Sequence, residues 1–200
     1  MFDNNSNYSA YLTRIYNAYG DWVTAFSNYL DETKEIRANY NQVAQYHALE
    51  EQRTKFAEVR NNSVYQIQQA GEELCAAISE NWRPNPQSYI TKAIETYSSE
   101  FLSPTVADLE HAAEDYGKNG TMLCALYNIA KKRGIDGDIQ RGSPLYHADR
   151  REKLEAARSL VNEILGIMNT DDPIKFRARQ AFLYNFEQYE AAKLEIIGNI

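Results

Sequence analysis

The sequence is poor in the residues that break helices or cross-link loops. Its 200 residues include only 5 Pro, 9 Gly and 2 Cys. Because Pro and interior Gly are the strongest helix breakers, their scarcity leaves room for long helices. The two cysteines, Cys75 and Cys124, lie within apolar helical patterns, so we expect buried free thiols. This pattern argues against a small scaffold held together by disulfides.

Long apolar runs are absent as well. A transmembrane helix needs roughly 18 or more consecutive apolar residues, and no window of the sequence approaches that length. The first residues, Met-Phe-Asp-Asn-Asn, have neither the basic segment nor the apolar run of a secretory signal. We therefore expect a cytoplasmic protein with no membrane contact.

Metal-binding patterns are incomplete. The spacing Asp108-x-x-His111, with Glu114 one turn later, resembles half of the pattern that binds two iron ions in helical bundles, but no second pair follows. A calcium loop that began at Asp136 would need Gly and Glu where the chain has Arg141 and His147. Neither a His-Glu-x-x-His motif nor a pair of Cys-x-x-Cys motifs occurs. We therefore predict no metal and no cofactor.

Catalytic motifs are missing too. The chain has no Gly-x-Ser-x-Gly elbow and no glycine-rich phosphate loop, and no His neighbours either cysteine in sequence. We therefore predict a protein that is not an enzyme and has no catalytic residue. Because groups far apart in sequence can converge in a fold, a helical enzyme or metal protein remains a third hypothesis.

The charge is unevenly distributed along the chain. The net charge is -7, and residues 1–130 carry 9 Lys/Arg against 17 Asp/Glu, whereas residues 131–179 carry 11 against 8. An acidic first part with a mildly basic later part permits head-to-tail self-association or docking on a basic partner. The alternative is that these charges form ordinary solvated helix faces.

One basic cluster is a candidate for contact with nucleic acid. It consists of Lys131, Lys132, Arg133, Arg141, Arg150, Arg151 and Lys153. Neutralising phosphates with such a cluster would release counterions and favour binding. Acidic residues are interleaved with the basic ones, however, and the whole chain is acidic, so we do not expect nucleic acid as a partner.

Apolar residues recur at every third and fourth position from Leu12 to Val43, and polar Thr33 is the single exception. A repeat of 3.5 residues is the seam of a helix that packs lengthwise on a partner helix. At 1.5 Å per residue this helix would be roughly 48 Å long. We therefore predict an interaction surface, called the seam below, formed by Leu12, Ile15, Tyr19, Trp22, Phe26, Tyr29, Ile36, Tyr40 and Val43.

Tyrosine is unusually frequent in the same region. Seven of the 15 tyrosines lie within residues 8–46. Tyrosine packs an apolar ring while keeping a polar tip, so it suits half-exposed faces and interfaces. The seam is therefore either an intramolecular core or an interface with another chain. The later helices are too short to cover all of it, so both alternatives stay open.

The remaining patterns predict an all-α fold with a long, coiled-coil-like helix or helical hairpin and about five shorter helices. The first helix runs from Tyr8 to about Arg60, and a bend at residues 61–63 would let Ser63 cap a second helix. The alternative is one helix as far as Trp82. Later helices cover residues 87–102 and 121–132 and begin at Ser103-Pro104, at Ser143-Pro144 and at Thr170. We predict two domains, a helical arm at 1–83 and a bundle at 84–200.

Residues 103–134 resemble helical segments of small tailed-phage virion and head-assembly proteins. The resemblance is carried by Ala107-Asp108-Leu109-Glu110, Tyr116-Gly117-Lys118-Asn119 and Thr121-Met122-Leu123-Cys124-Ala125-Leu126. It implies a structural or assembly role in a phage or prophage and carries over no active-site residue.

These patterns lead to a first hypothesis and an alternative. The first is a non-enzymatic interaction or assembly protein that forms a homo-oligomer, or binds another protein, through the seam. The alternative is a small acidic inhibitor or regulator that docks on a basic partner, such as a nucleic-acid-processing enzyme, and it follows from the acidic balance of residues 1–130.

Overall fold

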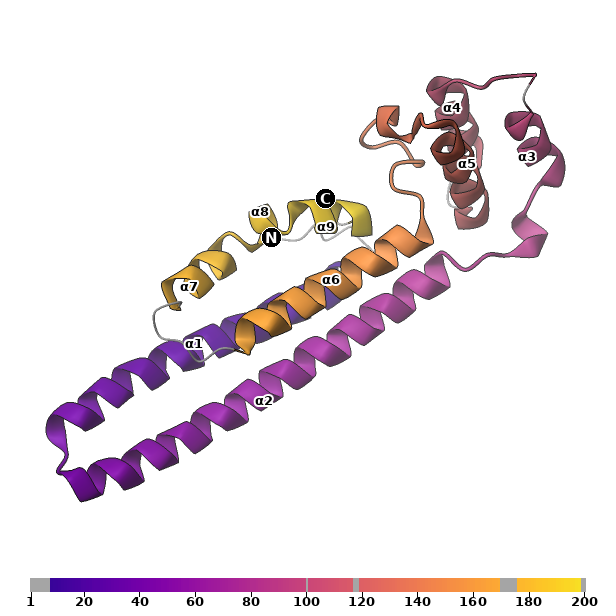
Figure 1. Cartoon of the computed structure of the whole chain (residues 1–200). Helices are drawn as coiled ribbons and strands as arrows, with labels where there is room; N and C mark the ends of the chain where they lie inside the picture. Colours follow the sequence, from indigo (N-terminus) through magenta and orange to yellow (C-terminus); the bar gives the residue numbers. More distant parts are fainter. Residues whose placement is uncertain (1–7, 100, 117–118, 170–175, 199–200) are drawn as a thin grey trace. The chain divides into compact units, whose positions relative to one another are not determined.

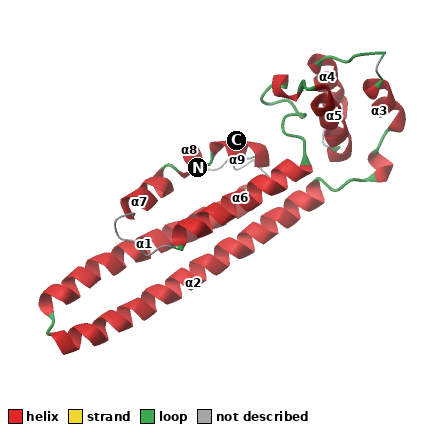
Figure 2. Cartoon of the chain, in the orientation of Figure 1, coloured by secondary structure: helices red, strands yellow, loops and turns green. Residues whose placement is uncertain are grey.

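The computed structural model describes residues 8–99, 101–116, 119–169 and 176–198. All regular secondary structure in these ranges is helical, and none of it is a strand (Figure 2). Two long helices come first and shorter ones follow. The all-α class with a long helical hairpin, predicted from the sequence, is confirmed.

The chain forms two compact units. Unit 1 consists of residues 1–75 and 156–200, and unit 2 consists of residues 76–155. The division expected from the sequence, 1–83 and 84–200, instead groups residues 156–200 with the second part. The difference arises because the last helices pack on the first helix, and the order of helices along a chain does not reveal which of them cover which.

In unit 1, helix α1 (Ser9–Asn39) and helix α2 (Gln42–Asn81) form an antiparallel hairpin (Figure 1). Arg14, near the start of α1, pairs with Glu73. Further along, the ring of Phe26 stacks on Phe56 at 5.4 Å, and the hydroxyl of Thr33 donates to Gln52 at 3.0 Å. Residue numbers thus rise along α1 as they fall along α2, as an antiparallel pair requires.

The hairpin turns at Tyr40 and Asn41, so the prediction of one helix from Tyr8 to Arg60 is wrong. Tyr40 has an extended backbone (φ -106°, ψ 150°), and its N–H donates to the carbonyl of Ile36. The Asn41 carboxamide then accepts from the N–H of Ala44 at 3.1 Å and caps α2. The seam spacing continues across this turn only because Tyr40 and Val43 are three residues apart in sequence.

Of the two alternatives at residues 61–63, a bend or a continuous helix, the structure shows the continuous one, because α2 passes through them without a break. Ser63 is not a cap but a buried residue, 2% exposed, on the same face as Phe56, Ile67 and Leu74. Asn and Ser are weak helix formers, and tertiary packing overrides a weak propensity of this kind. A small side chain is accommodated on the packed face.

Three later helices of unit 1, α7 (Phe176–Tyr184), α8 (Phe186–Tyr189) and α9 (Ala191–Ile197), follow α6 (Arg150–Met168). Helix α7 packs on α1. Helix α6 approaches α2 closely at Gly71, where an added Cβ would lie 2.7 Å from a methyl of Val161. Helix α9 is held to α6 by Lys193, whose ammonium lies 2.7 Å from Glu163. The predicted start of a helix at Thr170 lies outside the described residues.

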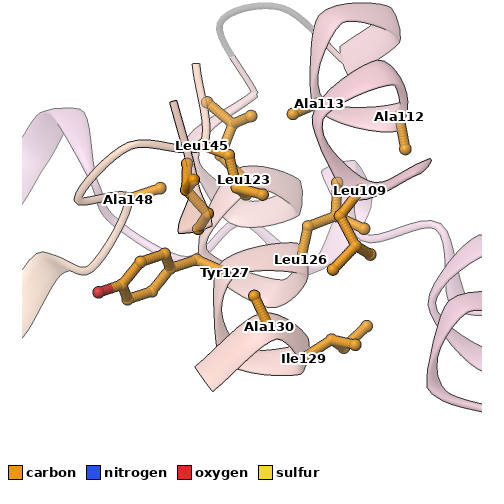
Figure 3. Close-up of a cluster of buried hydrophobic side chains, with 11 residues drawn as sticks. Leu109, Ala112, Ala113, Leu123, Leu126, Tyr127, Ile129, Ala130, Leu145 and Ala148 are labelled. Carbon is orange, nitrogen blue, oxygen red and sulfur yellow. The ribbon is translucent and has the colours of Figure 1, made fainter. Parts of the chain in front are cut away.

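Unit 2 contains η1 (Pro86–Ser88), α3 (Thr91–Ser98), α4 (Val106–Tyr116), α5 (Gly120–Arg133) and η2 (Asp136–Asp138). Its core lies mainly between α4 and α5, where Leu109 and Leu126 are fully buried (Figure 3). The predicted helix starts at Ser103-Pro104 and Ser143-Pro144 come too early. Thr105 and Asp149 instead bond the first turns of α4 and α6, which begin at Val106 and Arg150.

Candidate interaction surface

The structure divides the predicted seam into a buried half and an exposed end. Leu12, Ile15, Tyr19, Trp22 and Phe26 are each 0% exposed within the chain itself. The other four are increasingly accessible along the seam: Tyr29 and Ile36 are half-buried, Tyr40 is 51% exposed and Val43 is 73% exposed. Only the far end of the seam is therefore available to another molecule.

Helix α7 covers the buried half. The Arg179 guanidinium lies over the rings of Trp22 and Phe26, at 5.4 and 5.2 Å from their centroids. The Tyr19 hydroxyl donates to the Arg179 carbonyl at 3.2 Å, and its ring meets Phe182 edge to face at 5.5 Å. Burial raises the pKa of Tyr19, so its hydroxyl stays protonated. For this half, the structure supports the intramolecular interpretation of the aromatic pattern.

The exposed end is an uncharged surface at the turn of the hairpin, which we call the hairpin tip and define as residues 38–49. None of its twelve residues, Ala-Asn-Tyr-Asn-Gln-Val-Ala-Gln-Tyr-His-Ala-Leu, is Asp, Glu, Lys or Arg. Three large side chains stand in solvent here: Tyr40, Val43 and Tyr46, the last 66% exposed. Tyr46 is absent from the predicted set, and the signal for it was the change of phase in the apolar pattern after Val43.

Hydrogen bonds hold the hairpin tip in one conformation. The Gln45 side-chain amide donates to the Tyr40 carbonyl at 2.8 Å and to the Arg37 carbonyl at 3.0 Å. These carbonyls belong to the end of α1, where backbone acceptors lack helical partners. Together with the Asn41 cap, the bonds tie the end of α1 to the start of α2. The exposed rings are therefore presented on an ordered turn.

Charged residues begin where the hairpin tip ends, and several of them are paired. Lys34 lies 2.9 Å from Asp31 in α1, and Lys55 lies 2.7 Å from Glu51 in α2. An apolar and aromatic centre without charges, bordered by charged residues, is the residue distribution of a protein interface. The hairpin tip is thus the candidate interaction surface of unit 1.

The candidate metal residues of the sequence have other roles. The Asp108 carboxylate accepts from the backbone N–H and the hydroxyl of Thr105, at 2.8 and 2.7 Å, and stabilises the start of α4. These bonds lower the pKa of Asp108. His111 lies 3.6 Å from Glu114 on an exposed face. Across the described ranges, no group of three His, Cys, Asp or Glu side chains is arranged to hold a metal ion.

A cluster of titratable side chains does converge in unit 2. The Tyr127 hydroxyl donates to Glu152 at 3.1 Å, Lys131 pairs with the same carboxylate, and His147 Nδ1 lies 3.6 Å from it. Burial, with Glu152 nearby, raises the pKa of Tyr127 to about 12. Burial alone would raise the pKa of Glu152, but the bonds from Lys131 and Tyr127 lower it. Tyr127, Lys131 and His147 thus surround one carboxylate of unit 2, that of Glu152.

Members of the basic cluster make contacts inside unit 2. Lys131 is engaged with Glu152 and also lies 3.8 Å from Asp149. Lys153 is 4% exposed, and its ammonium lies 5.0 Å from the ring of Trp82. Arg133, a third member, donates to the Ser99 carbonyl at 2.9 Å.

Both cysteines are free thiols, as predicted, and both are half-buried rather than fully buried. Burial raises the pKa of Cys75 and of Cys124. Because the thiolate is the nucleophile, neither residue is activated at neutral pH.

Comparison with protein-family models, with curated proteins and with solved structures found no match to this chain. Within the described part of the chain, no helix combines the length and hydropathy that a membrane span requires.

Proposed function

We propose that this chain is an interaction protein that assembles through its hairpin tip. One observation carries the proposal: Tyr40, Val43 and Tyr46 are exposed together on an ordered turn that bears no charge. Aromatic side chains are enriched and charges are depleted at the centres of protein interfaces. The buried half of the seam supports the hairpin that presents this surface.

The partner that fits the hairpin tip is a second copy of the same chain. Two chains of net charge -7 repel each other over most of their surfaces, but two uncharged tips can meet without like-charge contact. The Asn, Gln and Tyr side chains of the tip supply both donors and acceptors, so the surface can complement itself across a two-fold axis. The tip is small compared with the roughly 800 Å² per partner of a standard interface. We therefore expect an equilibrium that depends on concentration.

The test is the mass in solution, measured by light scattering after size exclusion over a series of protein concentrations. The wild type should exceed the 23.0 kDa of one chain as the concentration rises. The variant Tyr40→Ser/Val43→Ser/Tyr46→Ser should stay monomeric at every concentration. The control is Tyr65→Ser, which removes a 63% exposed ring from α2 outside the tip and should assemble like the wild type. A monomeric wild type, or an assembling triple variant, contradicts the proposal.

Salt distinguishes this proposal from the acidic regulator. Contact between uncharged tips should persist at high ionic strength, whereas docking of the acidic residues 1–130 on a basic protein should weaken. A salt-sensitive complex with a basic partner, formed by a monomeric chain, would favour the regulator. An assembly role in a phage or prophage is compatible with self-association, and its support is the resemblance of residues 103–134.

A further inference from the structure

Unit 2 contains a cavity of about 650 Å³ beside helix α5 that the proposed assembly does not use. Its wall on α5 is formed by Ala125, Asn128, Ile129 and Lys132, which recur at helical spacing on one face. Leu126 lies in the core of unit 2, and Ile129 belongs both to that core and to the cavity wall (Figure 3). The helix thus supplies a core face and a cavity face at once.

The opposite wall is formed by Tyr89 and by Ile94 and Ser98 of α3. This wall is fastened to α5 at both ends. At one end the Asn119 side chain donates to the Ser88 carbonyl at 2.9 Å, and at the other the Arg133 guanidinium donates to the Ser99 carbonyl at 2.9 Å. Because both ends are tied, the cavity exists before any ligand arrives, and a preformed cavity of this volume lies within the range of small-molecule sites.

The lining combines apolar surface with positive charge. Ala125, Ile129 and Ile94 provide aliphatic groups, and Tyr89, 40% exposed, provides a ring. Lys132 and Arg133 are the charged members, and none of the eight lining residues is acidic. In a chain of net charge -7, a cavity whose lining charges are all positive selects for an anion.

We propose that this cavity binds a small amphipathic carboxylate, with its aliphatic tail against Ala125, Ile94 and Ile129 and its carboxylate beside Lys132. Lys132 is exposed, so its ammonium is accessible to a carboxylate, and the tail gains by leaving water. All the residues that line the site belong to unit 2. The site does not depend on assembly through the hairpin tip.

The probe is octanoate, with 1-octanol as its uncharged counterpart, titrated into the ¹⁵N-labelled full chain while amide chemical shifts are recorded. Octanoate should give saturable shifts at Ala125, Asn128, Ile129 and Lys132 and bind at least fivefold more tightly than octanol. Lys132→Gln should reduce octanoate affinity about fivefold, the effect of one charge-assisted contact, and leave octanol affinity unchanged. The matched control Arg151→Gln removes a cation of unit 2 that does not line the cavity and should change neither.

A filled cavity gives a second test. Ala125→Phe should abolish the shifts from both probes while preserving the circular dichroism of the wild type. If Ala125→Phe does not fold, the comparison of Lys132→Gln with Arg151→Gln still decides. Absence of saturable shifts with octanoate, or equal loss of affinity in Lys132→Gln and Arg151→Gln, would overturn the proposal.

Discussion

At the scale of single residues, Lys153 carries a charge into the interior of unit 2. Its side chain is buried, and its ammonium faces the ring of Trp82. Burial lowers the pKa of Lys153 from 10.5 to about 8, and the charge of Glu152 opposes this only in part. A buried cation of this kind costs stability, and contact with an aromatic face offsets some of the cost.

This cost should depend on pH. Between pH 8 and 10.5 the unfolded chain holds a proton at Lys153 that the folded chain has released, so the contribution of this residue to stability rises with pH across that window. Below pH 8 the cost is present in full. We therefore expect Lys153→Met to raise the free energy of unfolding by about 1–3 kcal/mol at pH 7. The gain should shrink by pH 10.

Urea unfolding of the wild type and of Lys153→Met at pH 7 and pH 10 measures both free energies. Lys92→Met, which removes an exposed lysine of α3, is the control and should show no comparable gain. A gain for Lys153→Met that is equal at the two pH values would contradict the burial of the ammonium group.

At the scale of helices, the close approach of α6 to α2 rests on a glycine. A Cβ at Gly71 would lie 2.7 Å from a methyl of Val161, a short-branched side chain with little freedom to move. Gly71→Ala should therefore destabilise the fold by about 1–2 kcal/mol, although alanine is the better helix former. Adding Val161→Ala should recover part of the loss, since it removes the clashing methyls.

The chain offers a matched control for this prediction. Gly166 lies in the last turn of α6, and no described atom outside its chain neighbours and the nearby backbone of the helix lies within 4 Å of a Cβ placed there. Gly166→Ala should stabilise the protein by about 0.5–1 kcal/mol through helix propensity alone. Thermal or urea unfolding of the wild type and the three variants gives the comparison, and stabilisation by Gly71→Ala would show that the helices do not approach as described.

The helical character of the chain followed from the sequence, but several helix boundaries did not. Periodicity identifies the apolar face of a helix. A short turn that happens to preserve the spacing, as between Tyr40 and Val43, leaves the apolar repeat unbroken, so the repeat does not reveal the turn. Asn41 was the local signal for that turn, because Asn is among the best caps. At Ser63 the local signal pointed to a break that packing overrides.

At the scale of the whole molecule, the buried and the exposed residues occupy different parts of one seam. Phe26 is fully buried among Trp22, Phe56 and Arg179, whereas Tyr40 and Val43 are exposed. The sequence showed the continuous seam but not this division, because covering α1 depends on helix α7, more than a hundred residues later. Of the predicted seam residues, only Tyr40 and Val43 are therefore exposed at the hairpin tip. Tyr46, the third large hydrophobic side chain exposed there, was not predicted.

Phe26→Ala should accordingly lower the free energy of unfolding by about 3–5 kcal/mol, the usual cost of removing a buried ring. In the folded protein the distribution of oligomers should match that of the wild type. Urea unfolding measures the stability, and light scattering measures the assembly. The tip variant Tyr40→Ser/Val43→Ser/Tyr46→Ser should show the reverse result, with assembly lost and the free energy of unfolding little changed. Loss of assembly in a folded Phe26→Ala protein would place the interface on the buried half instead.

Unit 1 is built from two segments of the chain, residues 1–75 and 156–200, and unit 2 is the segment between them in the sequence. A chain that emerges from the ribosome N-terminus first completes residues 76–155 before it completes α7. During that interval Tyr19, Trp22 and Phe26 lack the helix that covers them. Until α7 is synthesised, the nascent chain thus displays an aromatic surface that the finished protein conceals.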